Sequence, residues 1–391
     1  MHKNNDHRFA HQLIDKYHDS DTSMCIIVKD SKEARLINNE LSLYLNSENI
    51  NYFPENEILP YDHFSTPDNI LSDRFSILNS LEKEKKIIIT TIKSLFELYP
   101  TKDFFQSKKT FNLDDSLSLN KLEEILISLN YEKVNRIDGI NQYSLRGGII
   151  DIYTPIYRNP LRIEIFDNSI ESIRFFDLET QSSIKKSNNF RLSKSSLYTF
   201  NDHDLKIFRD NWREYFQEYD ERHCEIFQNL NTSSKAEGLD IYLPLFFSKT
   251  SNFFEIFDSH SFVVLDNFDD QIDTYNKYIQ QRFDDENIDS QRPLLLPSDL
   301  FCSLEIIKNE LPQESTWDFG IYEDFNYKDI NEILNDINLG KLAKYKIVLI
   351  TSIQSEYEAL FNKFKPNIRE IRISSSLFND KESSKLKVFF D

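Results

Sequence analysis

Glycines would have to build a phosphate-binding loop, because backbone N–H groups must approach the phosphates closely. The chain has only six glycines in its 391 residues, Gly139, Gly147, Gly148, Gly238, Gly320 and Gly340. None lies in a GxxxxGKS/T or GxGxxG pattern, since Gly340-Lys341 is followed by Leu342 and lacks the upstream glycine. The sequence therefore predicts that this chain holds no nucleotide through a P-loop.

Histidines and cysteines indicate no metal centre. His7 and His11 are four residues apart in an expected terminal helix, but no third ligand is nearby, and no HExxH pattern occurs. His223-Cys224 is an isolated pair, typical of a surface residue beside a core residue. The cysteines are odd in number, widely spaced and without a CxxC pattern, which favours a reducing, cytoplasmic setting: Cys25, Cys224 and Cys302. We expect no metal and no cofactor in this chain.

Carboxylates are too numerous to mark a catalytic pair, and no GxSxG motif supplies a nucleophile. Asp151 and Glu164 are expected on neighbouring strands, where charge pairing with Arg146 or Arg162 is the preferred interpretation. The residues give no positive case for catalysis, so binding becomes the function to look for.

Composition limits what could be bound. A hydrophobic share of 39% and an aromatic share of 14% indicate a folded protein with room for two to four domains. The formal charge of −19 argues against wrapping nucleic acid, because DNA affinity depends on cations that neutralise phosphates. Residues 146–194 are an exception, with 8 Lys+Arg against 6 Asp+Glu. This stretch could be a docking site for an acidic partner or only a mixed surface.

No signal-peptide core or membrane-length apolar run is present.

The elements that position this basic stretch are a pair of strands. Residues 162–166 alternate, with Ile163 and Ile165 on one face and Arg162, Glu164 and Phe166 on the other. Turn-forming residues follow at 167–169, and 170–176 resumes as a second strand, which predicts a hairpin. An outer face with arginine, carboxylate and an aromatic ring suits protein binding better than plain solvation.

Strands and helices alternate in the rest of the chain. We expect strands at 25–28, 51–53, 86–91, 261–266 and 346–351, and helices at 9–19, 32–44, from 68, from 92 to 98, 199–216, 271–284 and 356–364. Residues 238–248 read as strand and loop, and 118–131 as a helix capped by Ser118. This alternation predicts a parallel α/β layer interrupted by a small α+β unit rich in antiparallel pairing.

Two segments resemble a known family. LRGGIIDIYTP and LRIEIFDNSIESIRFFDLETQ, at residues 145–155 and 161–181, look like the signature shared by the transcription-repair coupling factor (Mfd) and UvrB. The upstream FPENEILPYDHFSTPDNILSDRFSIL, with FRDNWREYF, YLPLFF and RPLLLP in order, favours the coupling factor. The resemblance runs from about residue 25 to the C-terminus but covers only the N-terminal portion of the family protein, so we expect a truncated chain.

The resemblance implies a domain scheme. Domain 1a (1–110) and domain 1b (196–310) form one discontinuous α/β domain, a degenerate P-loop/helicase-like parallel sheet that has lost nucleotide binding. Domain 2 (111–195) is an inserted α+β domain that docks UvrA, and domain 3 (311–391) is a further small α/β domain. RNA polymerase, DNA, ATP and magnesium belong to regions of the family protein beyond these residues. We expect an adaptor in transcription-coupled nucleotide-excision repair.

Carried over by matching position, Arg146, Arg162 and Phe166 resemble the family's UvrA-contacting residues, and Glu164 is added because it shares their expected face. One departure is Asn141-Gln142-Tyr143, where the family commonly has Gly-Glu-Tyr or Gly-Glu-Phe, so this turn is expected to differ in shape. Two other interpretations stay open: part of an ATP-dependent translocase, and a UvrB-like module that binds damaged DNA directly.

Overall fold

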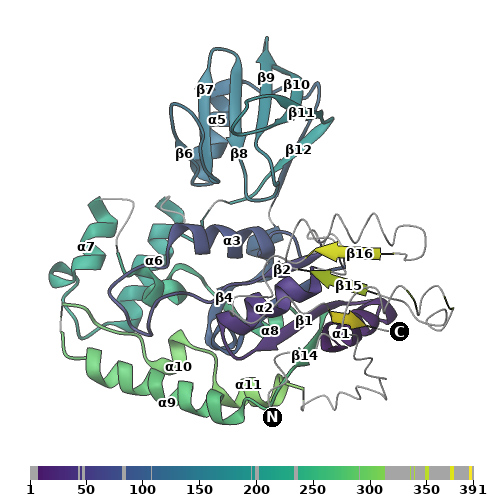
Figure 1. Cartoon of the computed structure of the whole chain (residues 1–391). Coiled ribbons are helices and arrows are strands. Elements are labelled where there is room, and N and C mark those ends of the chain that lie inside the picture. Colours follow the sequence, from purple (N-terminus) through teal and green to yellow (C-terminus); the bar gives the residue numbers. More distant parts are fainter. Residues whose placement is uncertain are drawn as a thin grey trace.

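The computed structural model describes residues 8–42, 45, 49–81, 85–106, 108–194, 196–198, 202–232, 237–289, 291–312, 335, 339, 348–351, 370–373 and 387–389. Figure 1 shows two lobes, with strands β6–β12 and helix α5 standing above a larger α/β lobe. Both lobes are mixtures of helix and strand, but the larger one is built on a parallel sheet and the smaller one on a mainly antiparallel sheet.

A parallel sheet organises the larger lobe. Its strand order is β14-β1-β3-β2, with strands β1 (Ser23–Val28), β2 (Ile50–Tyr52), β3 (Ile87–Thr91) and β14 (His260–Val264). β14 follows the smaller lobe in the chain yet pairs with β1, matching His260 to Ser23. The expected return of α/β character after residue 196 therefore takes the form of a strand added to the same sheet.

Helices cover both faces of this sheet, so side chains of β1 alternate between two cores. One core, with Ile26, contains residues of α1 (Arg8–Asp19) and α2 (Ser31–Leu41). The other, with Ile27, is aromatic-rich and contains residues of α3 (Asp68–Leu78), α6 (Asp202–Tyr215), the 3₁₀ segment η3 (Leu239–Phe246) and α9 (Asp269–Glu286). Shorter elements complete the lobe: η1 (Ile92–Phe96), β4 (Leu98–Pro100), α4 (Lys102–Gln106), η2 (Glu221–His223), α7 (Glu225–Thr232), β13 (Thr250–Asn252), α8 (Phe253–Ile256), α10 (Pro297–Leu300) and α11 (Leu304–Glu310).

The smaller lobe is a six-stranded sheet covered on one side only. Its order is β11-β10-β9-β8-β7-β6, and all neighbours are antiparallel except β6 and β7. Helix α5 (Leu119–Ser128) and the paired strands β5 (Lys109–Asn112) and β12 (Asn189–Leu192) contribute to the core beneath the sheet. The six strands are β6 (Glu132–Lys133), β7 (Gln142–Arg146), β8 (Ile149–Tyr153), β9 (Leu161–Phe166), β10 (Ser169–Phe176) and β11 (Ser183–Lys186).

The predicted hairpin and helix of this lobe are confirmed. β9 and β10 pair antiparallel, and only Asp167 and Asn168 separate Phe166 from its partner Ser169. Both turn residues have positive φ, 47° and 61°, as a type I′ turn requires. Ser118 caps α5 by accepting a hydrogen bond from the Lys121 amide.

Two expectations in the larger lobe need correction. The helix expected from residue 92 to 98 is present only as the short 3₁₀ helix η1, after which the chain enters β4, which pairs with β13. Residues 238–248 are not strand and loop but the 3₁₀ segment η3, which starts after Gly238 in the left-handed conformation. A Cβ on Gly238 would lie 2.9 Å from the His63 carbonyl oxygen, so this close approach needs glycine.

Of the C-terminal region the structure describes a three-stranded sheet, ordered β16-β15-β17, with β15 (Val348–Thr351), β16 (Glu370–Ile373) and β17 (Lys387–Phe389). The strand predicted at 346–351 corresponds to β15. The helix predicted at 356–364 lies outside the described residues. Within the described part of the chain, none of the helices is long and apolar enough to cross a membrane.

Candidate docking surface

The open face of the six-stranded sheet is the candidate site, and strand register decides which residues share it. Glu164 lies opposite Ile149 on one side and Ser172 on the other, and Arg162 lies opposite Asp151 and Arg174. Because alternate residues face the same way, we define the docking face by its members: Arg146, Ile149, Asp151, Arg162, Glu164, Phe166, Arg174, Phe176 and Lys186. It holds four cations against two carboxylates in a chain of net charge −19.

Asp151 is the centre of the charge network on this face. Its carboxylate is buried and accepts two hydrogen bonds from Arg162, at 2.7 and 2.8 Å, and one from Arg146 at 2.7 Å. These bonds hold the pKa of Arg162 above its ordinary value. The expected pairing of Asp151 with Arg146 or Arg162 is confirmed, and both arginines take part. One buried negative charge shared by two guanidinium groups leaves a net positive site.

The two arginines differ in how much of each guanidinium group remains available to a partner. Arg162 is only 17% exposed, donates a further hydrogen bond to Gln181 and stacks on Phe176, with 4.3 Å from guanidinium carbon to ring centroid. Arg146 is 54% exposed and makes one bond to Asp151. Arg146 can therefore offer a planar donor group to a partner. Arg162 mainly has a structural role in the surface around Arg146.

Glu164 was expected to pair with Arg146 or Arg162, but it pairs with neither. Its carboxylate instead binds the guanidinium group of Arg174 on the neighbouring strand. The Nε of Arg174 is buried and finds no acceptor among the residues described. Glu164 therefore neutralises one arginine at this end of the sheet, and its direct role in docking stays a prediction.

Phe166 is the exposed apolar group of the docking face, with 70% of its surface accessible at the tip of the β9–β10 hairpin. The RGG motif lies beside it. Gly147 has a φ of 61° in the turn between β7 and β8, and a Cβ on Gly148 would come within 3.0 Å of the Ile165 carbonyl oxygen. The two glycines thus allow the β7–β8 turn to pack closely against the strand that ends in Phe166.

The turn that departs from the family pattern is accounted for locally. Asn141 has a φ of 69°, a conformation that asparagine tolerates better than most residues. The Gln142 side-chain oxygen accepts from the amides of Asp138 and Gly139, at 2.9 and 3.0 Å. This side chain ties the turn to the start of β7.

Alternation in β9 placed Arg162, Glu164 and Phe166 on one face and the resemblance added Arg146, but neither identified the neighbouring residues. Ile149, Arg174 and Lys186 belong to the same face through strand pairing. The alternation within β9 could not reveal them, since cross-strand register depends on turn lengths and on the irregularity of β10 between Ile170 and Ser172. The run Ile173-Arg174-Phe175 could have indicated Arg174, because the same alternation of faces applies to the second strand of the hairpin.

In the larger lobe, the helix that follows β1 begins in a way that disfavours phosphate binding. Asp30 caps α2 by accepting from the Glu33 amide, and the Glu33 carboxylate accepts from the Lys29 amide, each at 2.9 Å. Burial raises the pKa of Glu33, and the nearby charges of Asp30 and Asp266 add to this. Carboxylates therefore occupy the helix N-terminus at which nucleotide-binding α/β proteins hold phosphate.

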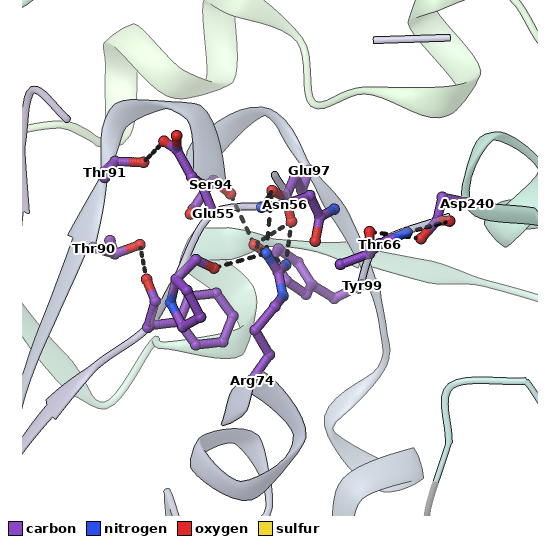
Figure 2. Close-up of polar contacts among 12 residues, drawn as sticks. Glu55, Asn56, Thr66, Arg74, Thr90, Thr91, Ser94, Glu97, Tyr99 and Asp240 are labelled. Carbon is purple, nitrogen blue, oxygen red and sulfur yellow. Dashed lines mark hydrogen bonds and ion pairs between the residues drawn. The ribbon is translucent and has the colours of Figure 1, made fainter. Parts of the chain in front are cut away.

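An arginine network also lies inside the larger lobe (Figure 2). Arg74 on α3 is buried, pairs with Glu97 and donates to the Pro54 carbonyl at 2.9 Å and to the Tyr99 hydroxyl at 3.3 Å. Its planar group also packs over the Phe53 ring. These contacts join α3 to the loop before it and to β4, so the network is structural.

His7 and the side chain of His11 lie outside the described residues, so the structure does not place this pair. His223 is exposed beside the Asp220 carboxylate, and Cys224 is a buried free thiol. Within the described part of the chain, no group of three or more His, Cys, Asp or Glu side chains could hold a metal ion.

Known proteins resemble this chain in the same regions. Residues 110–198, which include every strand of the docking face, match the UvrB interaction domain. The transcription-repair-coupling factor of Haemophilus influenzae is 28% identical over 289 residues, covering 73% of this chain and 25% of that protein. That of Rickettsia bellii is 28% identical over 375 residues, covering 92% and 32%, and that of Escherichia coli is 25% identical over 291 residues, covering 73% and 25%.

The chain thus spans about a quarter to a third of the length of the curated relatives it matches. The similarity covers both lobes, and the domain match coincides with the smaller lobe. The chain therefore resembles the N-terminal segment of the transcription-repair-coupling factors, and its residues 110–198 match the UvrB interaction domain.

Proposed function

We propose that this chain is a non-catalytic adaptor that docks UvrA through the docking face of its smaller lobe, and so recruits it to stalled transcription complexes. The observation that carries the proposal is a surplus of positive charge around an exposed aromatic side chain, on an open sheet face inside the UvrB interaction domain. Such a face fits a partner surface with carboxylates around an apolar pocket.

Arg146 and Phe166 are the residues proposed to contact UvrA directly. An exposed guanidinium held by one buried carboxylate can form two parallel hydrogen bonds with a partner carboxylate. An aromatic ring that is exposed in the free protein and buried in the complex gains the full benefit of leaving water. Arg162 supports Arg146 by sharing Asp151 with it, and it stacks on Phe176 of the same face.

The test compares two exposed apolar side chains of the same lobe. Phe166→Ala should weaken UvrA binding by about 1–3 kcal/mol, as expected for a hot spot, or roughly 5- to 150-fold in Kd. Ile127→Ala is the matched control, because Ile127 is 60% exposed on α5, across the core from the docking face. Isothermal titration with purified UvrA measures both.

Unfolding curves must accompany the titrations. Both variants should keep the wild-type stability within about 0.5 kcal/mol, since neither side chain is buried. Equal UvrA affinity for Phe166→Ala, Ile127→Ala and the wild type would show that the docking face is assigned to the wrong surface.

The larger lobe, in this proposal, is a degenerate P-loop/helicase-like layer that supports the docking lobe and binds no nucleotide itself. The carboxylates at the start of α2 and the lack of a glycine loop support this. Residues 1–110 and 196–310 would form this layer, and 311–391 a further small domain. RNA polymerase, DNA, ATP and magnesium would be bound through other parts of a longer protein in the cytoplasm.

A further inference from the structure

A cavity of about 100 Å³ lies in the larger lobe, away from the docking face. It is enclosed by segments far apart in the sequence: the loop at 56–61, α3, the start of β4, residues 197–198, η3, and the residues Tyr275, Leu300 and Phe301. A single water needs only roughly 10–15 Å³ measured this way, so the space can take a ring or a short branched chain. Most of its wall is apolar.

Asp240, near the start of η3, is the charged group of this cavity that forms no ion pair with the described residues. Its carboxylate accepts from the Thr66 amide at 3.2 Å and from the Thr66 hydroxyl at 3.0 Å (Figure 2). Among the residues that the structure describes, no Lys, Arg or His nitrogen lies within 4.0 Å of it. Burial raises the pKa of Asp240, and the hydrogen bonds from Thr66 and the charge of Arg74 offset only part of this rise.

The other charges of the wall are already matched. Arg74 pairs with Glu97, and Lys93 pairs with Glu55 at 3.0 Å. One more acceptor belongs to the wall, since the side-chain oxygen of Asn56 is buried and has no donor among the described residues. The cavity therefore combines a mostly apolar wall with a carboxylate that forms no close ion pair and an acceptor that receives no hydrogen bond from the described residues.

We propose that this cavity binds a small organic cation, an amine or guanidinium group on an apolar stem, with Asp240 as its counter-ion. The cationic head would donate to the free lone pairs of the Asp240 carboxylate while the stem packs against Leu71, Leu243 and Phe301. A free metabolite and a lysine or arginine side chain of a peptide share this chemistry. The proposal does not depend on UvrA docking, because no residue of the docking face lines the cavity.

Three probes of similar size and different charge test the proposal on the full chain: benzylamine, benzyl alcohol and benzoate. Benzylamine should bind at least about tenfold more tightly than either of the others in saturation-transfer NMR and raise the melting temperature by mass action. Its affinity should fall as the pH is lowered, because protonation of Asp240 removes the counter-ion.

Two variants keep the test decisive. Asp240→Asn retains an oxygen that can accept from Thr66 but removes the charge, and should abolish the preference for benzylamine over benzyl alcohol. Leu71→Trp keeps the charge and fills the space, and should abolish binding of all three probes. A preference for benzylamine that survives in Asp240→Asn, probe binding that survives in Leu71→Trp, or no preference for the cation in the wild type overturns the proposal.

A further titration distinguishes the two possible sources of the cation, a free small molecule and a peptide side chain. Acetyl-Phe-Arg-amide binding tenfold more tightly than benzylamine would indicate a peptide side chain, and the reverse order a free small molecule. If the peptide and benzylamine both fail to displace one another, they do not share the cavity, and the assignment of Asp240 as their common counter-ion is overturned.

Discussion

The two lobes each contain an arginine network, and the two networks have opposite characters. In the larger lobe, one arginine meets one carboxylate inside the fold, where Arg74 also satisfies the Pro54 carbonyl. In the smaller lobe, two arginines share Asp151 at the surface of a sheet, and Arg146 remains half exposed. The first network is neutral and closed, whereas the second carries a positive charge that is open to a partner.

The difference follows from how each sheet is covered. A parallel sheet has helices on both faces, so an arginine that enters its surroundings must be neutralised within the fold. A mainly antiparallel sheet can leave one face in water, and only the counter-ion, Asp151, has to be buried. The number of arginines therefore does not identify a docking surface. An exposed arginine that shares its counter-ion with a second arginine does indicate one.

The largest predicted effect is the loss of stability when the arginine network of the larger lobe is broken. Arg74→Ala would leave Glu97 without its cation in a largely buried site and should cost about 3–5 kcal/mol in the free energy of unfolding. Urea unfolding monitored by tryptophan fluorescence measures this, since Trp212 lies in the same core.

A double variant provides the control. Replacing Arg74 and Glu97 together by methionine should recover most of the lost stability, because no unpaired charge remains. A loss below about 1 kcal/mol for Arg74→Ala would contradict the view of this network as a closed structural pair.

A pH effect of somewhat smaller size is expected in the larger lobe. Burial, with a smaller contribution from Lys102, lowers the pKa of His260 on β14 from 6.5 to about 4. The unfolded chain then binds a proton that the folded chain refuses, so stability falls as the pH drops from about 6.5 towards 4, by up to about 3 kcal/mol.

His260→Gln isolates this contribution. The variant should lose less stability than the wild type between neutral pH and pH 4, because it has no imidazole to protonate on unfolding. Parallel pH profiles for wild type and variant would show that His260 is not held neutral by its surroundings.

The smallest stability effects distinguish the two arginines of the docking face. Arg162→Ala should cost about 1–3 kcal/mol of stability, because it leaves the buried Asp151 with one partner and uncovers Phe176. Arg146→Ala should cost less than about 1 kcal/mol, because its side chain is exposed and makes one bond.

Binding should reverse this ranking. UvrA titrations of the folded variants should show that Arg146→Ala loses at least as much affinity as Arg162→Ala, since Arg146 offers free donors to a partner. If Arg162→Ala alone weakens binding, the recognition residue is the one that we assign a supporting role.

Local patterns were enough for much of the docking lobe. Alternation in residues 162–166 identified which side chains of β9 face outwards, and Asp167-Asn168 supplied the positive φ that the turn needs. The helix capped by Ser118 followed from an apolar stripe and an oxygen that can accept from the first turn. In each case the cause lies within about ten residues of its effect.

Predictions that depended on distant contacts were the ones that went wrong. Residues 92–98 have helical spacing, but pairing of β4 with β13 pulls 98–100 into a strand. Glu164 was expected to meet Arg146 or Arg162, and register placed it beside Arg174 instead. Residues 238–248 are apolar enough for a strand, yet aromatic packing against α6 holds them as a 3₁₀ segment.

By itself, the sequence determined that the chain has no glycine loop for phosphate, and that Arg162, Glu164 and Phe166 share one strand face, because both are properties of neighbouring residues. Only the tertiary structure decided that Asp151 joins Arg146 to Arg162, that Arg74 is closed off by Glu97, and that Asp240 lines a cavity without an ion-pair partner among the described residues. These outcomes depend on which strands and helices meet, and local residue patterns do not specify such long-range pairings.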